Sequence, residues 1–378
     1  MSLGPNAARA MRMIDPAIYE GFEHCATNNL SPDKANYWFS FCKGQDSESK
    51  NGTKILDLWC ETGQTSVHRA RYLNELAALV PNSIAHFGKR LEDIEQDGDG
   101  VVLKFSDGST ATHSAVIGCD GVKSRTRKIV LGPDHPAAQP QFSGKYAYRG
   151  LISMSRATEL VGAELAQNAQ MYLGRGGHIL TFPIEKGQTM NVVAFSTKED
   201  GKWEDEEWVK PMDREGMEKD FEGWVESTRR ILSLMEKPDV WALFDHAPAP
   251  AYTKGRVCIL GDAAHASTPH QGAGAGQAIE DALIMSRVMA LVYTSEGIER
   301  AFVAYDRVRR PRSQRQVATA REAGLLYDLQ APGIGDDWEK IREQLRVRQN
   351  WLWERDLEVD TRDAEEAFRR LQGQGARL

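Results

Sequence analysis

The sequence predicts an α/β protein with short parallel strands buried in a sheet. Two apolar runs, residues 115–119 and 257–260, carry no charged side chain and are typical of strands covered on both faces. Each run is followed by a Gly/Asp pair, and the second leads through a glycine-rich loop into a helical pattern from 277 to about 292. Residues 141 to about 195 contain further strand patterns, which indicates a second, β-rich region.

Composition is that of a globular enzyme and excludes several other classes. Of the 378 residues, 41% are hydrophobic and 27% are charged, which excludes collagen-like and disordered chains. Lys and Arg number 47 against 54 Asp and Glu, a net charge of −7, so neither nucleic acid nor a membrane surface is an expected partner. No run approaches the roughly 20 apolar residues that cross a bilayer.

The five cysteines are Cys25, Cys42, Cys60, Cys119 and Cys258, and they form no CxxC pair. An odd number of widely spaced cysteines is typical of reduced thiols in an intracellular protein, so we expect a cytoplasmic location. The histidines and cysteines show no metal-ligand spacing, so no metal is expected.

The first 80 residues predict two helices around one strand. Residues 7–14 form the first helix, with Asn6 near its N-cap, and residues 55–60 form the strand. Thr65 or Ser66 caps the second helix, whose apolar face contains Leu73, Leu76, Ala77 and Val80. Arg69 lies on that same face. It either points inward toward an anionic partner or extends from the first turn into solvent.

The rest of the chain alternates between strand and helix patterns. Two Asp-Gly turns, within 97–100 and at 107–108, predict a three-stranded meander over 91–113. A helical stretch follows the β-rich region at 212–234, and the last fifty residues have the pattern of charged amphipathic helices.

Two carboxylates lie directly after the buried strands, Asp120 before Gly121 and Asp262 after Gly261. Open α/β sheets bind ligands at the carboxyl ends of their strands, and a carboxylate there can accept hydrogen bonds from ribose or ribitol hydroxyls. The alternative for each pair alone is an ordinary turn.

The segment from Gly272 to Gly276 has the sequence Gly-Ala-Gly-Ala-Gly at the start of the long helix. Glycines there expose backbone N–H groups, and the helix dipole adds positive potential, so the segment predicts a site that stabilises negative charge. Its spacing matches neither the dinucleotide GxGxxG nor the P-loop.

Residues 255–281, GRVCILGDAAHASTPHQGAGAGQAIED, closely resemble the flavin-binding GD motif of single-component FAD-dependent aromatic hydroxylases, especially the salicylate hydroxylase-like branch. Six shorter segments strengthen the resemblance. Residues 115–125 are similar to the DG motif of this family, residues 5–7 and 67–70 to its PNA and HRA helices, and 148–150, 178–183 and 191–195 to its substrate-domain strands.

The resemblance implies a p-hydroxybenzoate hydroxylase-like fold, with FAD and NAD(P)H as cofactors and a small phenolic or aromatic acid and O₂ as substrates. By the resemblance, Asp262 after Gly261 meets the ribitol, Asp120 with Gly121 lies near the flavin and the path of the reductant, and Arg69 contacts FAD. Pro269 and the segment Gly272, Ala273 and Gly274 would line the isoalloxazine ring. The implied domains are 1–140, the first part of the FAD-binding domain; 141–250, the substrate-binding sheet; 251–320, the second FAD part with the GD motif; and 321–378, C-terminal helices.

The chain departs from the family pattern at its start. Residues 1–60 contain no GxGxxG, whereas the family carries one in its first βαβ unit for the FAD pyrophosphate. We therefore expect a truncated chain that purifies with little flavin and leaves an apolar edge uncovered beside the strands ending at Cys119 and Leu260.

Three side chains are candidates for contact with the substrate. His270, directly before the glycines, is the first candidate for a catalytic base; the alternative is a histidine that only packs in the loop. Arg149 and His178 lie on predicted substrate-domain strands. For both, a structural or outward-facing side chain is favoured over one that faces the substrate ring. His246 is expected to be structural.

The sequence leaves two other functions open. One is a binding protein that kept the fold and lost flavin and catalysis, which a colourless purified protein would favour. The other is an oxygenase of the same fold that acts on a non-aromatic substrate. In that case hydroxybenzoates would not stimulate NAD(P)H oxidation. The oligomeric state is also open, with a homodimer as one option.

Overall fold

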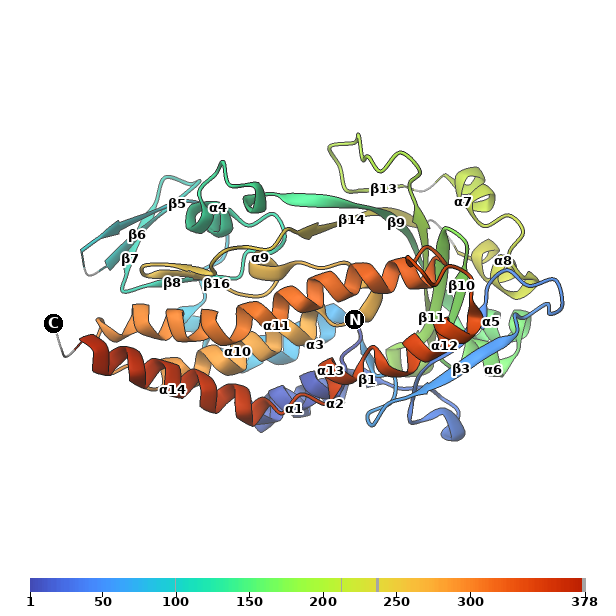
Figure 1. The fold of residues 1–378 in the computed structure, drawn as a ribbon, viewed down its shortest axis with the longest axis horizontal. Helices are drawn as coiled ribbons and strands as arrows, with labels where there is room; N and C mark the ends of the chain where they lie inside the picture. The colour runs from blue at the N-terminus through green and yellow to red at the C-terminus, as the bar shows by residue number, and fades with distance from the viewer. Residues whose placement is uncertain (99, 212, 236–237, 376–378) are drawn as a thin grey trace.

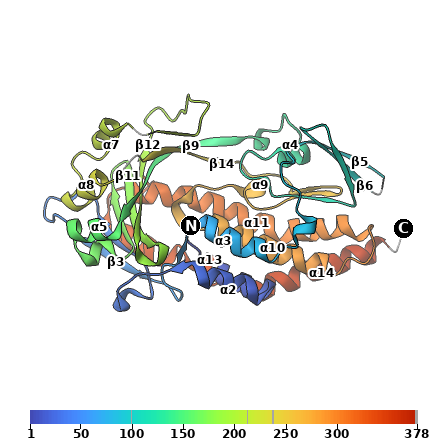
Figure 2. The same cartoon turned by 180° about the vertical axis from the view of Figure 1, so that it is seen from behind.

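A computed structural model describes residues 1–375 except 99, 212, 236 and 237. A large sheet stands at one end, long helices run along the molecule, and a small meander lies at the other end (Figure 1). Figure 2 shows the same arrangement from behind. Asp99 of the predicted turn, Met212 of the predicted helical stretch and residues 376–378 of the predicted C-terminal region lie outside the described residues.

The largest sheet of the described residues has eight strands, all neighbours being antiparallel except β10 and β2. Its order is β13 (Val209–Pro211), β14 (Asp239–His246), β9 (Pro140–Ser153), β12 (Thr189–Thr197), β11 (Gly177–Ile184), β10 (Gln170–Gly174), β2 (Tyr37–Lys43) and β3 (Lys54–Trp59). The predicted β-rich region is therefore confirmed. The sheet also recruits β2 and β3, from residues that the resemblance assigns to the FAD-binding domain.

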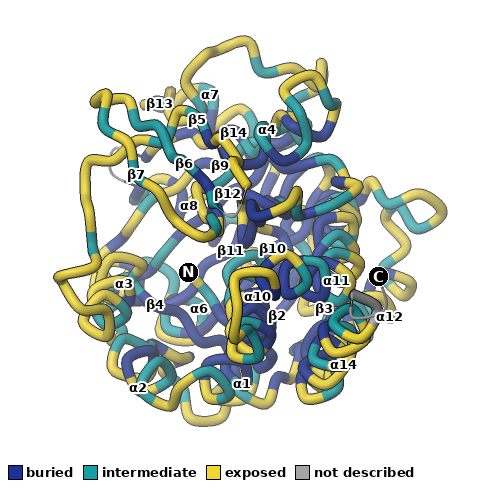
Figure 3. Tube along the Cα trace, turned by 90° about the vertical axis from the view of Figure 1, so that its left-hand side faces the viewer, coloured by how far each residue is buried: buried dark blue, intermediate teal, exposed yellow. Residues whose placement is uncertain are grey.

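Helices cover both faces of this sheet. One face packs on α11 (Gly297–Tyr327), α12 (Trp338–Val347) and α13 (Asn350–Trp353). The opposite face packs on α5 (Met154–Val161), α6 (Ala163–Ala166), α7 (Arg214–Asp220) and α8 (Glu226–Ser233). The predicted stretch 212–234 is thus two helices, with residues 221–225 between them. Buried residues follow the interior of β9–β12, as the view along the molecule shows (Figure 3).

The two buried runs form a parallel pair, β8 (Val116–Gly118) beside β16 (Val257–Ile259), with β15 (Thr253–Lys254) on the far side of β16. β16 is fully buried, as predicted. β8 is the edge strand of this sheet among the described residues, and Ile117 is 41% exposed. The prediction that 115–119 is covered on both faces is therefore wrong for Ile117. The uncovered edge is present there but not at Leu260, which is buried.

The remaining strands are short. The predicted meander is confirmed as β5 (Leu91–Asp97), β6 (Gly100–Phe105) and β7 (Thr110–His113), joined in that order. β1 (Ala26–Thr27) pairs with β4 (Ser66–Val67). α2 (Pro16–Cys25) and α4 (Arg125–Leu131) complete the N-terminal half.

The long helices α10 (Gly274–Met289), α11 and α14 (Leu357–Gly375) pack against one another, with α1 (Pro5–Ile14) and α9 (Asp262–His265) against α10. The predicted helix 277–292 starts three residues earlier than expected. Gly4 is the N-cap of α1, and the Asn6 side chain instead donates a hydrogen bond to Glu280 across 2.7 Å. The expected helix is confirmed with Asn6 near its N-cap, and the Asn6 amide bonds α10 and does not cap the helix.

The predicted apolar face of the helix after Thr65 is also wrong. The helix is α3 (Arg69–Ala78), and its N-cap is His68, since residues 66 and 67 form β4. Tyr72 is its buried residue, whereas Leu73 is 48% exposed and Val80 is also exposed. Arg69 is exposed, which agrees with an arginine that extends into solvent.

Within the described residues, no helix is long and apolar enough to cross a membrane. The same residues contain no group of three or more His, Cys, Asp or Glu side chains placed to hold a metal ion.

Candidate active site

A cavity of about 340 Å³ lies between one face of the eight-stranded sheet and the segment 267–275. We call it the sheet–loop cavity. Arg149 lines its sheet wall, while Asp262 and His270 line the opposite wall. The predicted ring-contacting residues Pro269, Gly272, Ala273 and Gly274 line it as well. Residues predicted from distant parts of the chain are therefore brought together around one space.

The sheet wall follows from the two-residue period of strands. Arg149 on β9 lies opposite Val193 on β12, so the next residue on the same face of β12 is Asn191. The Arg149 guanidinium lies 4.8 Å from the centroid of the Trp241 ring. The Asn191 amide nitrogen is buried and has no hydrogen-bond partner among the described residues. Arg149 and Asn191 are thus polar groups on a wall otherwise made of apolar and aromatic side chains such as Phe182.

The opposite wall is backbone-rich. Gly272 has φ +64°, a left-handed conformation that favours glycine and turns the chain toward α10. α10 begins at Gly274 with no side-chain cap, so its first N–H groups have no partner within the helix. Such N–H groups at the start of a 16-residue helix stabilise negative charge in the cavity.

His270 and His178 are in direct contact. Their ring nitrogens Nδ1 and Nε2, respectively, are 3.2 Å apart, and both side chains are buried. His178 stacks on Phe195 with ring centroids 4.4 Å apart. It does not line the cavity, so the expectation that favoured a structural role for His178 agrees with its position, whereas Arg149 faces the cavity.

Sequence reasoning missed the partners of this histidine pair. His178 Nδ1 lies 2.6 Å from a carboxylate oxygen of Asp328, at the end of α11, and Asp328 also pairs with Lys145 on β9. Tyr327, its neighbour on α11, lines the cavity. A run of aromatic residues at 37–41, YWFSF, is a strand signal that could have placed Trp38, Phe39 and Phe41 on the sheet wall.

A buried ionic cluster holds the Gly261–Asp262 turn in place. Asp281 accepts hydrogen bonds from the Gly261 backbone across 2.9 Å, from Arg309 across 2.8 Å and from His265 across 2.5 Å. Arg309 also donates to Glu280 across 2.6 Å. Because Asp281 fixes the backbone directly before Asp262, the cluster determines where the Asp262 carboxylate lies.

This cluster predicts acid sensitivity. Burial alone would raise the pKa of Asp281, but His265 and Arg309 outweigh it and lower the pKa from 3.8 to about 2. A lowered pKa stabilises the fold at pH values above 3.8, and that contribution is lost as the pH falls toward 2. At about 1.4 kcal/mol per pKa unit, we expect Asp281 to account for about 2 kcal/mol of that loss.

Urea unfolding at neutral pH and at steps below pH 4 measures this effect. In Asp281→Asn the free energy of unfolding should fall less as the pH is lowered. Substitution of the exposed Asp363 on α14 should leave this pH dependence unchanged. An equally steep dependence in Asp281→Asn would contradict the assignment.

Asp120 and Gly121 lie away from the sheet–loop cavity. The Asp120 carboxylate accepts hydrogen bonds from the Ser124 hydroxyl across 2.5 Å and from the Arg125 backbone across 2.8 Å, so it fixes the start of α4. Asp120 lines a separate groove together with Lys89, Arg90 and Lys128. A cofactor role for Asp120, Gly121 and Arg69 therefore remains a prediction.

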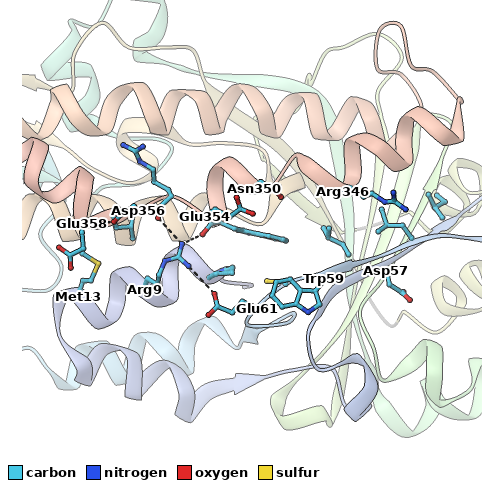
Figure 4. Close-up of a pocket in the computed structure, with 18 residues that line it drawn as sticks. Arg9, Met13, Asp57, Trp59, Glu61, Arg346, Asn350, Glu354, Asp356 and Glu358 are labelled. Carbon is cyan, nitrogen blue, oxygen red and sulfur yellow. Dashed lines mark hydrogen bonds and ion pairs between the residues drawn. The ribbon is translucent and has the colours of Figure 1, made fainter.

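A larger cavity of about 870 Å³ lies between α1, β3 and the segment that joins α13 to α14 (Figure 4). Arg9 crosses it, donating to the backbone oxygens of Trp353 and Arg355 and lying 3.9 Å from a Glu61 carboxylate oxygen. None of the predicted site residues lines this cavity. Arg9 thereby connects α1 to the segment between α13 and α14, and this cavity lies apart from His270.

The sheet–loop cavity fits the isoalloxazine and ribitol parts of a flavin. Asp262, exposed at the first position of α9, offers a carboxylate to ribitol hydroxyls. The first N–H groups of α10, at residues 274–276, would stabilise negative charge on a flavin pyrimidine, and the apolar sheet wall would exclude water.

Comparisons with known proteins show the family of this chain. The family described as FAD binding domain matches residues 32–320. The chain is 45% identical to 6-methylsalicylate 1-monooxygenase of Aspergillus terreus over 97% of this chain and 83% of that protein. It is 39% identical to a salicylate hydroxylase of Pseudomonas putida over 96% of this chain and 85% of that protein.

A solved salicylate hydroxylase substrate complex superposes with a TM-score of 0.89 at 36% identity, covering 96% of this chain and 90% of the other. The p-hydroxybenzoate hydroxylase-like α/β fold with C-terminal helices, expected from the motifs, is thereby confirmed as the FAD-binding fold of salicylate hydroxylase. The chain belongs to the FAD binding domain family and is an FAD-dependent monooxygenase of the salicylate hydroxylase type.

Proposed function

We propose that this protein hydroxylates a 2-hydroxybenzoate, a salicylate-like aromatic acid, in the sheet–loop cavity with NAD(P)H and O₂. The observation that carries the proposal is the meeting of Arg149, His270 and the glycine segment 272–274 around one apolar cavity. A guanidinium suits a carboxylate, a neutral imidazole suits a phenolic proton, and the apolar wall suits an aromatic ring.

Each side chain has a distinct task in this proposal. Arg149 binds the substrate carboxylate and thereby fixes how the ring enters the cavity. Burial, together with neighbouring His178, holds the pKa of His270 well below its usual range, so His270 is neutral at physiological pH and can accept a proton. When bound, FAD supplies the redox chemistry that takes electrons from NAD(P)H and activates O₂ for transfer of one oxygen atom.

The names of the relatives support this substrate class. One relative is named for 6-methylsalicylate and another for salicylate, and both compounds are 2-hydroxybenzoates. The purified protein, supplied with FAD, should oxidise NADH or NADPH faster when salicylate or 6-methylsalicylate is added. With isotopically labelled dioxygen, mass spectrometry should find one labelled oxygen in the phenolic product. No stimulation by any hydroxybenzoate would overturn the proposal and favour a non-aromatic substrate.

Arg149 is expected to control substrate affinity. Arg149→Gln removes a charge-assisted hydrogen bond of about 1.5–3 kcal/mol, so KM for the hydroxybenzoate should rise roughly 10- to 100-fold with a smaller change in kcat. Steady-state kinetics with salicylate measures both constants. Arg175→Gln is the matched control, because Arg175 is exposed and pairs with Asp336 outside the cavity. An unchanged KM in Arg149→Gln would show that Arg149 does not bind the substrate carboxylate.

Asp262 is expected to control flavin affinity. Asp262→Ala removes the carboxylate that we assign to the ribitol chain, so the dissociation constant for added FAD should rise roughly 10- to 100-fold while the fold is kept. Quenching of flavin fluorescence during titration measures it, and circular dichroism checks the fold. The exposed Asp363→Ala on α14 is the control. Equal FAD affinity in both variants would show that Asp262 does not hold the flavin.

We further propose a cytoplasmic location and leave a homodimer as a testable assembly. Within the described structure all five cysteines are free, which agrees with a reducing compartment. Cell fractionation and light scattering of the purified protein test these two points.

A further inference from the structure

Behind His270 lies a buried chain of polar side chains that leads away from the cavity. It runs from His270 in the short turn η5 (Pro269–Gln271) to His178 on β11 and then to Asp328 at the end of α11. Asp328 in turn accepts hydrogen bonds from Lys145 and, across 3.0 Å, from the Thr197 hydroxyl. Five separate elements of the fold thus supply one hydrogen-bonded line.

The protons along this line can be assigned from donor and acceptor capacity. Asp328 is buried; burial alone would raise its pKa, but His178 and Lys145 outweigh this and hold the pKa below its usual range, so the carboxylate is ionised and only accepts. His178 must therefore donate from Nδ1 to Asp328. Burial lowers the pKa of His178, so its ring is neutral and its Nε2 is an acceptor.

The same donor and acceptor argument determines which ring nitrogen of His270 carries the proton. Its Nδ1 faces the acceptor Nε2 of His178 and therefore carries the proton. Its Nε2 then carries a lone pair and no proton, and this nitrogen is buried with no hydrogen-bond partner among the described residues. Any proton that His270 accepts must go to Nε2.

The ring of His270 packs against uncharged residues of β12 and α11. β12 contributes Phe195, whose ring centroid is 5.0 Å away, and α11 contributes Gly324. A Cβ at Gly324 would come within 2.6 Å of the His270 ring, so α11 presses directly on the ring at a point where only hydrogen fits. The titratable groups that act on it are His178 from β11, Asp328 at the end of α11 and Lys145 from β9, and Tyr327 packs on the far member of the pair, His178.

We infer that Asp328 and His178 are positioning residues that hold the proton of His270 on Nδ1 and leave Nε2 as its basic atom. The inference rests on the proposed function, in which His270 accepts the phenolic proton. In that step the substrate O–H bond breaks and an Nε2–H bond forms, which leaves a phenolate and an imidazolium. The Asp328 carboxylate, one imidazole away, then stabilises the imidazolium charge.

The first test reads the tautomers directly and needs neither flavin nor substrate. Protein labelled with nitrogen-15 in histidine is studied by NMR through two-bond couplings, which distinguish a protonated from an unprotonated ring nitrogen. Signals are assigned with His178→Phe and His270→Phe. We expect Nδ1 protonated and Nε2 unprotonated in both histidines of the unmodified protein. A proton on Nε2 of His270 would overturn the inference.

The second test reverses the direction of the hydrogen bonds along these side chains with one nearly isosteric substitution. In Asp328→Asn the amide can donate to His178 Nδ1, which would move the His178 proton to Nε2 and force the His270 proton to Nε2 as well. Asp57→Asn is the matched control, because Asp57 likewise accepts from lysines and a hydroxyl, Lys34, Lys54 and Ser40, but has no histidine. The control should leave both tautomers unchanged.

Kinetics separate this inference from the proposed function. If Asp328→Asn folds, we expect kcat with salicylate to fall roughly 10²- to 10⁴-fold, as when a histidine base is held in the wrong tautomer, with KM nearly unchanged. Unchanged tautomers and unchanged kcat in a folded Asp328→Asn would overturn the inference alone. No hydroxylation by the unmodified protein would overturn the proposed function, while the tautomers would still decide the inference. If Asp328→Asn does not fold, the unmodified protein decides it.

Discussion

Replacing His270 by glutamine is expected to lower kcat for hydroxylation roughly 10²- to 10⁴-fold. General base catalysis by one positioned side chain contributes about that much, and a glutamine amide accepts no proton at neutral pH. KM should change little, because Arg149 rather than His270 is assigned to the substrate carboxylate. NAD(P)H oxidation should continue with a smaller share of hydroxylated product.

The measurement compares product formed with NAD(P)H consumed, for His270→Gln and for His246→Gln. His246 is the matched control: it is also a buried histidine, burial lowers its pKa to about 3, and it does not line the sheet–loop cavity. The control should keep kcat and its coupling to product. If His270→Gln also kept both, His270 would be a packing residue of the loop and not a base.

The parts of the site that the sequence predicts well are those contained in one stretch of chain. Asp262, Pro269, His270 and Gly274 fall within thirteen residues, and local rules decide their conformation: a strand end, a left-handed glycine and a helix start. The hairpin strands are predictable for the same reason, because their two-residue period and Asp-Gly turns are local features. In the structure these residues line one cavity.

The parts that the sequence leaves undetermined depend on distant contacts. His178 meets Asp328 across 150 positions, and no local pattern identifies an aspartate at a helix end as the partner of a histidine on a strand. α11 is a further example. Its 31 residues contain Pro311 and many charged side chains, so its length and its packing against the cavity are not evident from periodicity.

The wrong prediction for the buried face of α3 has a similar physical cause. Leu73, Ala77 and Val80 satisfy the helical spacing of an apolar face, yet all three are exposed, and α3 packs through Tyr72 with Leu76 half-buried. Periodicity shows that a face is apolar, but what covers it depends on neighbouring elements. The same limit applies to Ile117, whose strand is apolar but lies at a sheet edge.

The largest stability effect is expected at Arg309. This guanidinium is fully buried and donates to Asp281, Glu280 and the backbone and side-chain oxygens of Gln277. Removing one partner of a buried ion pair leaves an uncompensated charge and typically costs about 3–5 kcal/mol. Folded proteins have only about 5–15 kcal/mol of stability, so Arg309→Met should lose much of it.

Guanidinium chloride unfolding of Arg309→Met and Arg310→Met tests this expectation at neutral pH. Arg310 is the next residue of the same helix, is partly exposed and pairs with Asp306, so its loss should cost only about 0–1 kcal/mol. Arg309→Met should also bind FAD more weakly, because Asp281 would no longer hold the Gly261 backbone before Asp262. Equal unfolding midpoints and equal slopes for the two variants would show that Glu280 and Asp281 are neutralised by other groups, Arg312 and His265 foremost. The Gly261–Asp262 turn would then not depend on Arg309.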